Sequence, residues 1–220
     1  MKTLVIAPHS DDEIFGCGGT LLRREAEGGE LGWLLVTGVS EATGGSAEGV
    51  RKHTAEVSEI TKLIGFRKVY DLRLSPARLD TFPLSEIVQK FSAVFNEFQP
   101  NEVFLPHRSD VHTDHRIVFD AAAACTKWFR HPSVKRVLAY ETISETEFGL
   151  DADCAFRPNY FIDITRFLDL KLEAMAVYQS ELGDFPFPRS ATAIRAAAAL
   201  RGSNAGFIAA EAFQLLRERQ

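Results

Sequence analysis

Four ionisable side chains follow directly on an apolar segment near the start of the chain. In "LVIAPHSDDE" the run from Leu4 to Ala7 leads into His9, Asp11 and Asp12, with Glu13 next. An unpaired charge at the end of a buried strand is costly, so these residue types in this place need an explanation. Glu13 is expected mainly as a first-turn helix acid or as a group that supports the site residues from outside.

A second group of the same residue types follows a later apolar segment. The stretch "VFLPHRSDVHTDH" ends in Asp110, His112, Asp114 and His115 before a helical pattern begins. If both apolar segments are parallel strands next to each other, the two groups lie at the same edge of a sheet, where α/β proteins place their ligand crevice. We therefore expect the two groups to meet.

Imidazoles and carboxylates brought together in this way are ligands for a divalent transition metal. Three protein ligands with open coordination positions are typical of a catalytic zinc site. A bound cation would also offset the free energy lost when the acids are desolvated. The sequence therefore predicts a metal centre at the strand ends.

The elements that must position these residues alternate between strand-like and helix-like patterns. Apolar β-forming runs predict strands at 3–7, 32–37, 67–72, 102–106, 136–140 and 159–163. Helical periodicity predicts helices at 12–26, 48–64, 84–98, 114–128, 166–180, 189–200 and 205–218. This alternation indicates an α/β fold: a Rossmann-like, mostly parallel sheet with helices on both faces, strand order 3-2-1-4-5 and a helical C-terminal segment. We expect one domain over residues 1–220.

Composition and charge exclude several other classes of protein. Apolar residues make up 45% and charged residues 25% of the chain, and the formal net charge is −5, which argues against a nucleic-acid partner. No window approaches the roughly 18 apolar residues of a membrane helix. "MKTLVIAPHSDDE" is too short for a signal h-region. The odd, widely spaced set Cys17, Cys125 and Cys154 fits a reducing compartment, so we expect buried thiols in a cytoplasmic protein without a membrane partner.

The two motifs, P-H-x-D-D-E and H-x-D-H, resemble those of the PIG-L/LmbE-like family of zinc-dependent N-acetylglucosaminide deacetylases. The stretches "YETISETEF" (140–148), "KLEAMAVYQSEL" (171–182) and "RGSNAGFIAAEAF" (201–213) are similar to the family as well, so the resemblance spans nearly the whole chain. It implies an N-deacetylase, a hydrolase of linear amide C–N bonds. Its substrate would be an N-acyl, most simply N-acetyl, amino sugar in a small glycoconjugate.

Carried over position by position, the resemblance implies a metal site formed by His9, Asp12 and His115. It implies that Asp11 is the general base that deprotonates a metal-activated water. His112 would act on the tetrahedral intermediate as an acid or an electrostatic stabiliser, and Asp114 would orient a neighbouring imidazole. The implied cofactor is Zn²⁺, with Fe²⁺ or another divalent transition metal as an alternative.

Three positions depart from the pattern of the family. His53, three residues before Glu56, stands where many relatives have the Arg of an R-x-x-E element, and Asp110 stands where some have a Tyr. The segment "SPARLD" (75–80) replaces a frequent Asp-Gly turn. We expect all three differences to affect substrate recognition more than the metal.

Two other functions stay open from the residues alone. Two His and one carboxylate are also the ligand set of non-haem Fe(II) enzymes, and a non-catalytic carbohydrate-binding module would keep the same ligands. Asp11 counts against the second of these. The expected partner is a small N-acyl amino sugar, and a homo-oligomer is compatible with the sequence.

The glycines of "GCGGT" predict close packing of the first helix, and Phe185 and Phe187 predict core or loop packing.

Overall fold

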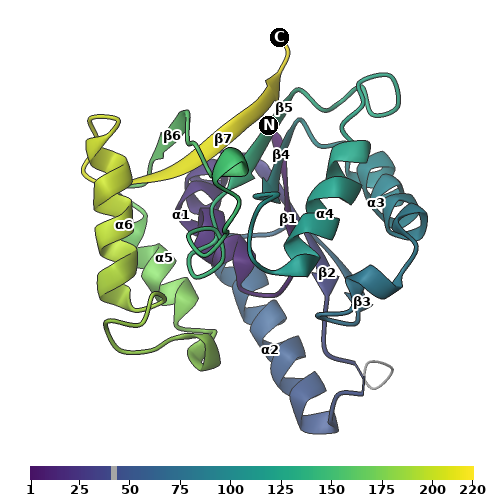
Figure 1. The fold of residues 1–220 in the computed structure, drawn as a ribbon, viewed down its shortest axis with the longest axis horizontal. Coiled ribbons are helices and arrows are strands. Elements are labelled where there is room, and N and C mark those ends of the chain that lie inside the picture. The colour runs from purple at the N-terminus through teal and green to yellow at the C-terminus, as the bar shows by residue number, and fades with distance from the viewer. Residues whose placement is uncertain (41–43) are drawn as a thin grey trace.

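In the computed structural model, which describes residues 1–40 and 44–220, a seven-stranded sheet runs through the centre of the molecule (Figure 1). Its strand order is β3-β2-β1-β4-β5-β7-β6. The strands are β1 (Lys2–Ala7), β2 (Glu30–Thr37), β3 (Lys68–Leu74), β4 (Glu102–Pro106), β5 (Arg136–Tyr140), β6 (Tyr160–Asp163) and β7 (Ala210–Glu218). The first five strands are parallel to one another, and the predicted order 3-2-1-4-5 is confirmed.

Helices cover both faces of the sheet, and the sheet separates two apolar cores. α3 and α4 pack on one face, whereas α1, α2, α5 and α6 lie on the other (Figure 1). Continuous apolar strands buried from both sides produce this layered arrangement. The predicted α/β fold is therefore confirmed, with helices α1 (Asp12–Ala26), α2 (Ala47–Ile64), α3 (Leu84–Phe98), α4 (Thr113–Ala124), α5 (Leu168–Met175) and α6 (Ala191–Ser203).

The prediction of a helix at 205–218 is wrong. Residues Ala210–Glu218 form β7, which lies between β5 and β6 and pairs antiparallel with both. Its first four residues are buried and three of them are apolar, a pattern too short for its periodicity to distinguish a strand from a buried helix. The C-terminal region is thus helical only in α5, α6 and the short 3₁₀ turn Gln179–Glu181.

Helix α1 is interrupted at Cys17, whose φ of −148° and ψ of 21° are not helical. Glu211 from β7 accepts hydrogen bonds from the backbone N–H groups of Gly19 (2.9 Å) and Thr20 (2.7 Å), so its carboxylate caps the second half of the helix. Lys171 from α5 donates to the carbonyl oxygen of Phe15 and to Glu211. This buried ion pair holds the break in place.

The glycines of α1 allow close packing, as the sequence predicts. A Cβ atom at Gly16 would lie 2.3 Å from the ring of Tyr140, and one at Gly19 would lie 2.9 Å from Ile164.

The expectation of three buried thiols is wrong in one case: Cys17 and Cys125 are buried, but Cys154 is exposed.

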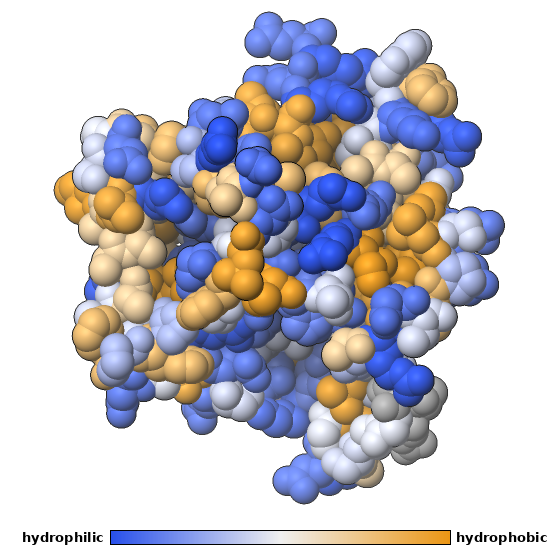
Figure 2. Space-filling view, viewed as in Figure 1, coloured by the Kyte–Doolittle hydropathy of each residue, from blue (hydrophilic) through white to orange (hydrophobic). Residues whose placement is uncertain are grey.

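Hydrophilic residues cover most of the viewed face, with separate hydrophobic groups among them (Figure 2). Val111, Phe148 and Leu150 are exposed apolar residues. None of the helices within residues 1–40 and 44–220 combines the length and apolarity needed to cross a membrane.

Candidate active site

The two groups of ionisable residues meet at one edge of the sheet. β1 and β4 are parallel neighbours, with Val5 opposite Phe104, so the loops that follow Ala7 and Pro106 leave the sheet side by side. The first loop leads into α1, which begins at Asp12, and the second leads into α4, which begins at Thr113. This is the switch point at which the strand order reverses.

His9, Asp12 and His115 form a group with the geometry of a metal site. Their ligand atoms lie within 4.8 Å of one another. Oδ2 of Asp12 is 3.3 Å from Nδ1 of His9 and 3.3 Å from Nε2 of His115. Asp12 and His115 are buried, whereas His9 is partly open to solvent.

A second layer of carboxylates orients both imidazoles. Asp114 lies 3.1 Å from Nε2 of His9, and Asp110 lies 2.8 Å from Nδ1 of His115. Each ring can thus donate its outer N–H to an acid and direct the lone pair of its other nitrogen toward Asp12. Histidines that bind metals usually have such an outer carboxylate. The chemistry and placement of these donors therefore fit a divalent metal held by His9, Asp12 and His115.

His9, His112 and Asp114 form an alternative group with ligand atoms equally close together. Its carboxylate, however, is already engaged, because Asp114 accepts hydrogen bonds from the backbone N–H groups of Ala77 (2.7 Å) and Leu79 (3.2 Å). These two hydrogen bonds place Asp114 where it can orient the ring of His9. Asp12 accepts a single backbone hydrogen bond among the described residues, from the N–H of His9 (2.8 Å), so the group with Asp12 suits an ion better.

The charge on Asp12 and the charges on His9 and His115 stabilise one another. Burial opposes a charge on His9, but hydrogen bonds to Asp114 and Asp12 outweigh it and raise the pKa of His9 to about 9. For His115, burial is likewise outweighed by Asp12 and Asp110, which raise its pKa to about 10. Burial also opposes the charge on Asp12, yet His115 and His9 hold its pKa well below the usual value. A carboxylate that stays charged at this depth suits a cation site.

The side chain of Asp11 forms its hydrogen bond with Arg189 and not with the candidate metal ligands. Its Oδ2 accepts a hydrogen bond of 2.8 Å from Nη1 of Arg189, while Oδ1 has no hydrogen-bond partner among residues 1–40 and 44–220. Burial and the charge of Asp12 raise the pKa of Asp11 to about 8, against the opposing effect of Arg189. Asp11 precedes α1 but makes no side-chain cap there, so the structure offers no support for a mere capping role.

His112 is the N-cap of α4. Its Nδ1 accepts a hydrogen bond from the backbone N–H of Asp114 (3.1 Å), so in the neutral ring the proton is on Nε2. The ring lies edge-on to His9, with 4.5 Å between ring centroids. Burial lowers the pKa of His112, which favours a neutral ring that can donate from Nε2.

Two of the three departures from the family pattern contact residues of the candidate metal site, and their expected effect on substrate recognition stays a prediction. Asp110 binds His115, and it also accepts a hydrogen bond from Thr146 at 2.6 Å. The segment 75–80 supplies the N–H groups that fix Asp114. His53 is buried beside Ser10, with 3.5 Å between the hydroxyl and Nδ1, and its Nε2 has no hydrogen-bond partner among the described residues.

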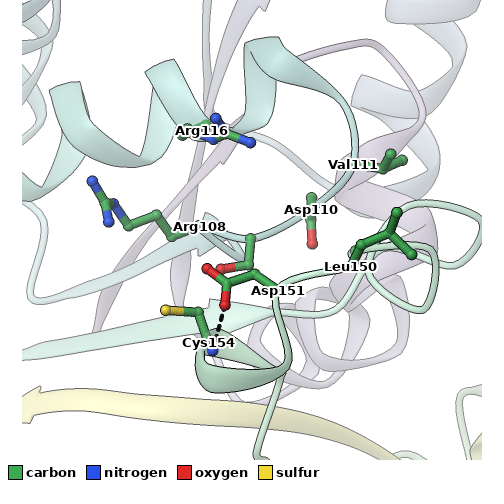
Figure 3. Close-up of a pocket in the computed structure, with 9 residues that line it drawn as sticks. Arg108, Asp110, Val111, Arg116, Leu150, Asp151 and Cys154 are labelled. Carbon is green, nitrogen blue, oxygen red and sulfur yellow. Dashed lines mark hydrogen bonds between the residues drawn. The ribbon is translucent and has the colours of Figure 1, made fainter.

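Asp110 also lines a cavity of about 450 Å³ beside the site (Figure 3). In the close-up Arg116 lies on one side of this cavity, and Asp151 and Cys154 lie opposite, on the segment after β5. Phe185 and Phe187 are exposed, so neither packs in the core. Phe187 lies against Gly183, which is loop packing, and Phe185 lines a separate cavity of about 500 Å³.

Two residues that the sequence did not reveal, Tyr178 and Arg189, contact the first motif, P-H-x-D-D-E, although they are distant from it in the chain. Tyr178 donates a hydrogen bond of 2.7 Å to Glu13, which in turn accepts from the backbone N–H of Asp11. Burial raises the pKa of Glu13 well above its usual value. Arg189 binds Asp11 directly. Glu13 therefore holds the backbone of Asp11, and Arg189 holds its side chain.

Comparison with known proteins gives consistent matches. The family model described as PIG-L, GlcNAc-PI de-N-acetylase, matches residues 4–126. The diacetylchitobiose deacetylase of Thermococcus kodakarensis is 25% identical over 195 residues, covering 82% of this chain and 70% of the relative.

Solved structures share the fold. The N,N'-diacetylchitobiose deacetylase from Pyrococcus horikoshii has a TM-score of 0.78 at 24% identity, covering 98% of this chain and 84% of that one. The conserved protein TT1542 from Thermus thermophilus has a TM-score of 0.77 at 26% identity, covering 99% of this chain and 96% of that one.

Proposed function

Because the chain belongs to the PIG-L family, whose model matches more than half of its length, we propose that it is a metal-dependent N-deacetylase. Its substrate is a small glycoconjugate that carries an N-acyl, most simply an N-acetyl, amino sugar. The name of the family and that of the Thermococcus relative support this reaction. Residues 1–220 would form one catalytic domain.

The proposed metal ligands are His9, Asp12 and His115. Zn²⁺ suits two imidazoles and one carboxylate, and Fe²⁺ or another divalent transition metal would fit the same donors. When bound, the ion would polarise the acyl carbonyl and lower the pKa of a water toward about 7. The single observation that carries the proposal is the pair of outer acids, Asp110 and Asp114, which turn both imidazoles toward Asp12.

Asp11 acts as the general base in this proposal. Its Oδ1, which has no partner among the described residues, takes a proton from the attacking water as the water oxygen bonds to the acyl carbon. The C–N bond then breaks, and the proton passes from Asp11 to the leaving amine. The products are a carboxylate and a free amino sugar. His112 supports the step, because its Nε2–H can donate to the oxygen on which negative charge develops.

The two alternative functions have less support. A non-haem Fe(II) enzyme would use the same three ligands, but it has no need of a separate carboxylate base beside them. A binding module has no need of one either. Asp11, held by both Glu13 and Arg189, therefore favours hydrolysis.

Acetate release tests the proposal. Protein loaded with Zn²⁺ or Fe²⁺ is assayed against a panel of N-acetylglucosamine conjugates, and we expect acetate from at least one. Asp11→Asn should lower kcat by about 10²-fold or more, since general-base catalysis contributes about 10²–10⁴-fold. Asp169→Asn, at an exposed position on α5, is the matched control and should keep full activity. No acetate from any conjugate, or full activity in Asp11→Asn, would refute the proposal.

A further inference from the structure

Arg189 is a mostly buried arginine that connects three segments around the candidate site. It precedes α6, and its side chain is only 11% exposed. Nη1 donates to Asp11 (2.8 Å) and to Glu181 (3.2 Å), and Nε donates to Ser144 (2.7 Å). The guanidinium also lies over the ring of Phe15, 4.7 Å from its centroid. Its position is therefore fixed from several directions.

Asp11, which receives the shortest of these bonds to an acid, has an unusual backbone conformation. Its φ is 155°, in a region that L residues rarely adopt. The backbone is held there because its N–H donates to Glu13 and its carbonyl accepts from the N–H groups of Ile14 and Phe15. A residue in such a conformation persists only where its surroundings determine it, and such residues are frequent at functional sites.

The carboxylate of Asp11 is buried, and Arg189 holds one of its two oxygens. Among residues 1–40 and 44–220, Arg189 is the only hydrogen-bond donor to this carboxylate, and it binds Oδ2 alone. Oδ1 remains available to accept a proton. One oxygen is therefore anchored and the other is left for the reaction.

We propose that Arg189 is the positioning residue for Asp11: it holds Oδ2 so that Oδ1 faces the attacking water. This inference rests on the proposed function, because it gives Asp11 the role of general base. Arginine suits the task better than lysine, since its planar fork can bind Asp11 through Nη1 and Ser144 through Nε at once. A purely structural role for Arg189 would be to fasten the segment before α6, and that role predicts a loss of stability without a specific loss of kcat.

The first test is kinetic. Arg189→Gln should lower kcat about 100-fold, because a misplacement of about 1 Å can reduce a rate by that factor. KM should change less than about threefold and the metal content should stay at the wild-type value. Guanidinium added to Arg189→Ala should restore part of kcat. Arg195→Gln, which breaks an exposed ion pair with Asp169 on the same side of the molecule, is the matched control and should behave as wild type.

Arg189→Lys covers the case in which the glutamine variant does not fold. It keeps the positive charge but cannot bridge Asp11 and Ser144, so we expect a stable protein with kcat lowered about tenfold. Wild-type kcat in Arg189→Gln or in Arg189→Lys would overturn the proposal. So would equal loss of activity and metal content, because this would show a structural role.

A crystal structure of Arg189→Gln, or of Arg189→Lys if only that variant folds, decides the question without an activity assay. We expect the Asp11 carboxylate to leave its wild-type orientation while His9, Asp12 and His115 keep theirs. An unmoved Asp11 carboxylate would overturn the role of Arg189. If wild-type protein releases acetate from no conjugate, the proposed function fails, whereas the orientation of Asp11 still tests what Arg189 does.

Discussion

Asp110 has the shortest contact to an imidazole in the candidate site, and it is fully buried. It lies 2.8 Å from Nδ1 of His115 and also binds the hydroxyl of Thr146. A carboxylate in this position fixes the tautomer of the ring and makes its other nitrogen a better metal ligand. We therefore expect Asp110 to contribute to metal affinity although it has no ligand atom of its own in the proposed set.

Asp110→Asn should weaken Zn²⁺ binding by about 10–100-fold, the range typical for loss of such an outer partner. The amide keeps the shape of the side chain but removes its charge. The dissociation constant is measured by competition with a chromogenic chelator. Asp120→Asn, at a position on α4, breaks an exposed pair with Arg108; it is the control and should bind Zn²⁺ as wild type does. Unchanged affinity in Asp110→Asn would contradict the assigned role.

At the level of elements, β7 determines how α1 is built. Glu211 on this strand caps the second half of α1 and pairs with Lys171 at 2.7 Å, and both side chains are about 95% buried. A buried ion pair that loses one partner leaves an uncompensated charge. The interruption of α1 at Cys17 is thus stabilised by a strand from late in the chain.

Glu211→Gln should lower the free energy of unfolding by about 3–5 kcal/mol, because it leaves Lys171 buried and unpaired. The double variant Glu211→Gln with Lys171→Met should lose less than the single variant. Urea denaturation measures both. Lys68→Gln, from an exposed pair with Glu97, is the control and should lose at most about 1 kcal/mol. Similar losses in the free energy of unfolding for Glu211→Gln and Lys68→Gln would show that the buried pair stabilises the fold no more than the exposed pair does.

The elements also show which features can be predicted from this sequence. β1, β2, β4 and β5 follow from long apolar runs, and their order follows from the alternation with helices. β7 could not be predicted, because "AEAFQLLRE" has a periodicity compatible with a helix and becomes a strand only through pairing with β5 and β6.

The residues of the two site motifs could be identified because they follow strand ends. Arg189 and Tyr178 could not, because single residues 178 and 165 positions away from their partners carry no local signal.

On the scale of the whole molecule, three histidines outside the candidate ligand group are buried and resist protonation. Burial lowers the pKa of His53, of His107 and of His131. In the unfolded chain an imidazole has a pKa of about 6.5. As the pH falls below that value, the unfolded state binds protons that the folded state does not, so the free energy of unfolding decreases.

His131→Gln tests this pH dependence away from the candidate site. His131 contacts Ser92 and Phe95 on α3, and its pKa is lowered by burial and by Arg130. Below about pH 6.5 the variant should lose less stability per pH unit than wild type does, by up to about 1.4 kcal/mol, the value for one proton. Urea denaturation from pH 7.5 to 5 measures the difference, with no other histidine changed. Parallel profiles for the two proteins would show that His131 is protonated equally in the folded and unfolded states.

In the proposed site, two groups of residues that are distant in the chain bind one divalent metal. The most direct measurement is anomalous diffraction at the zinc edge from crystals of the protein loaded with one equivalent of Zn²⁺. We predict one strong peak about 2.0–2.2 Å from Nδ1 of His9, Oδ2 of Asp12 and Nε2 of His115. A peak bound instead by His9, His112 and Asp114, or no peak at this edge of the sheet, would contradict the account.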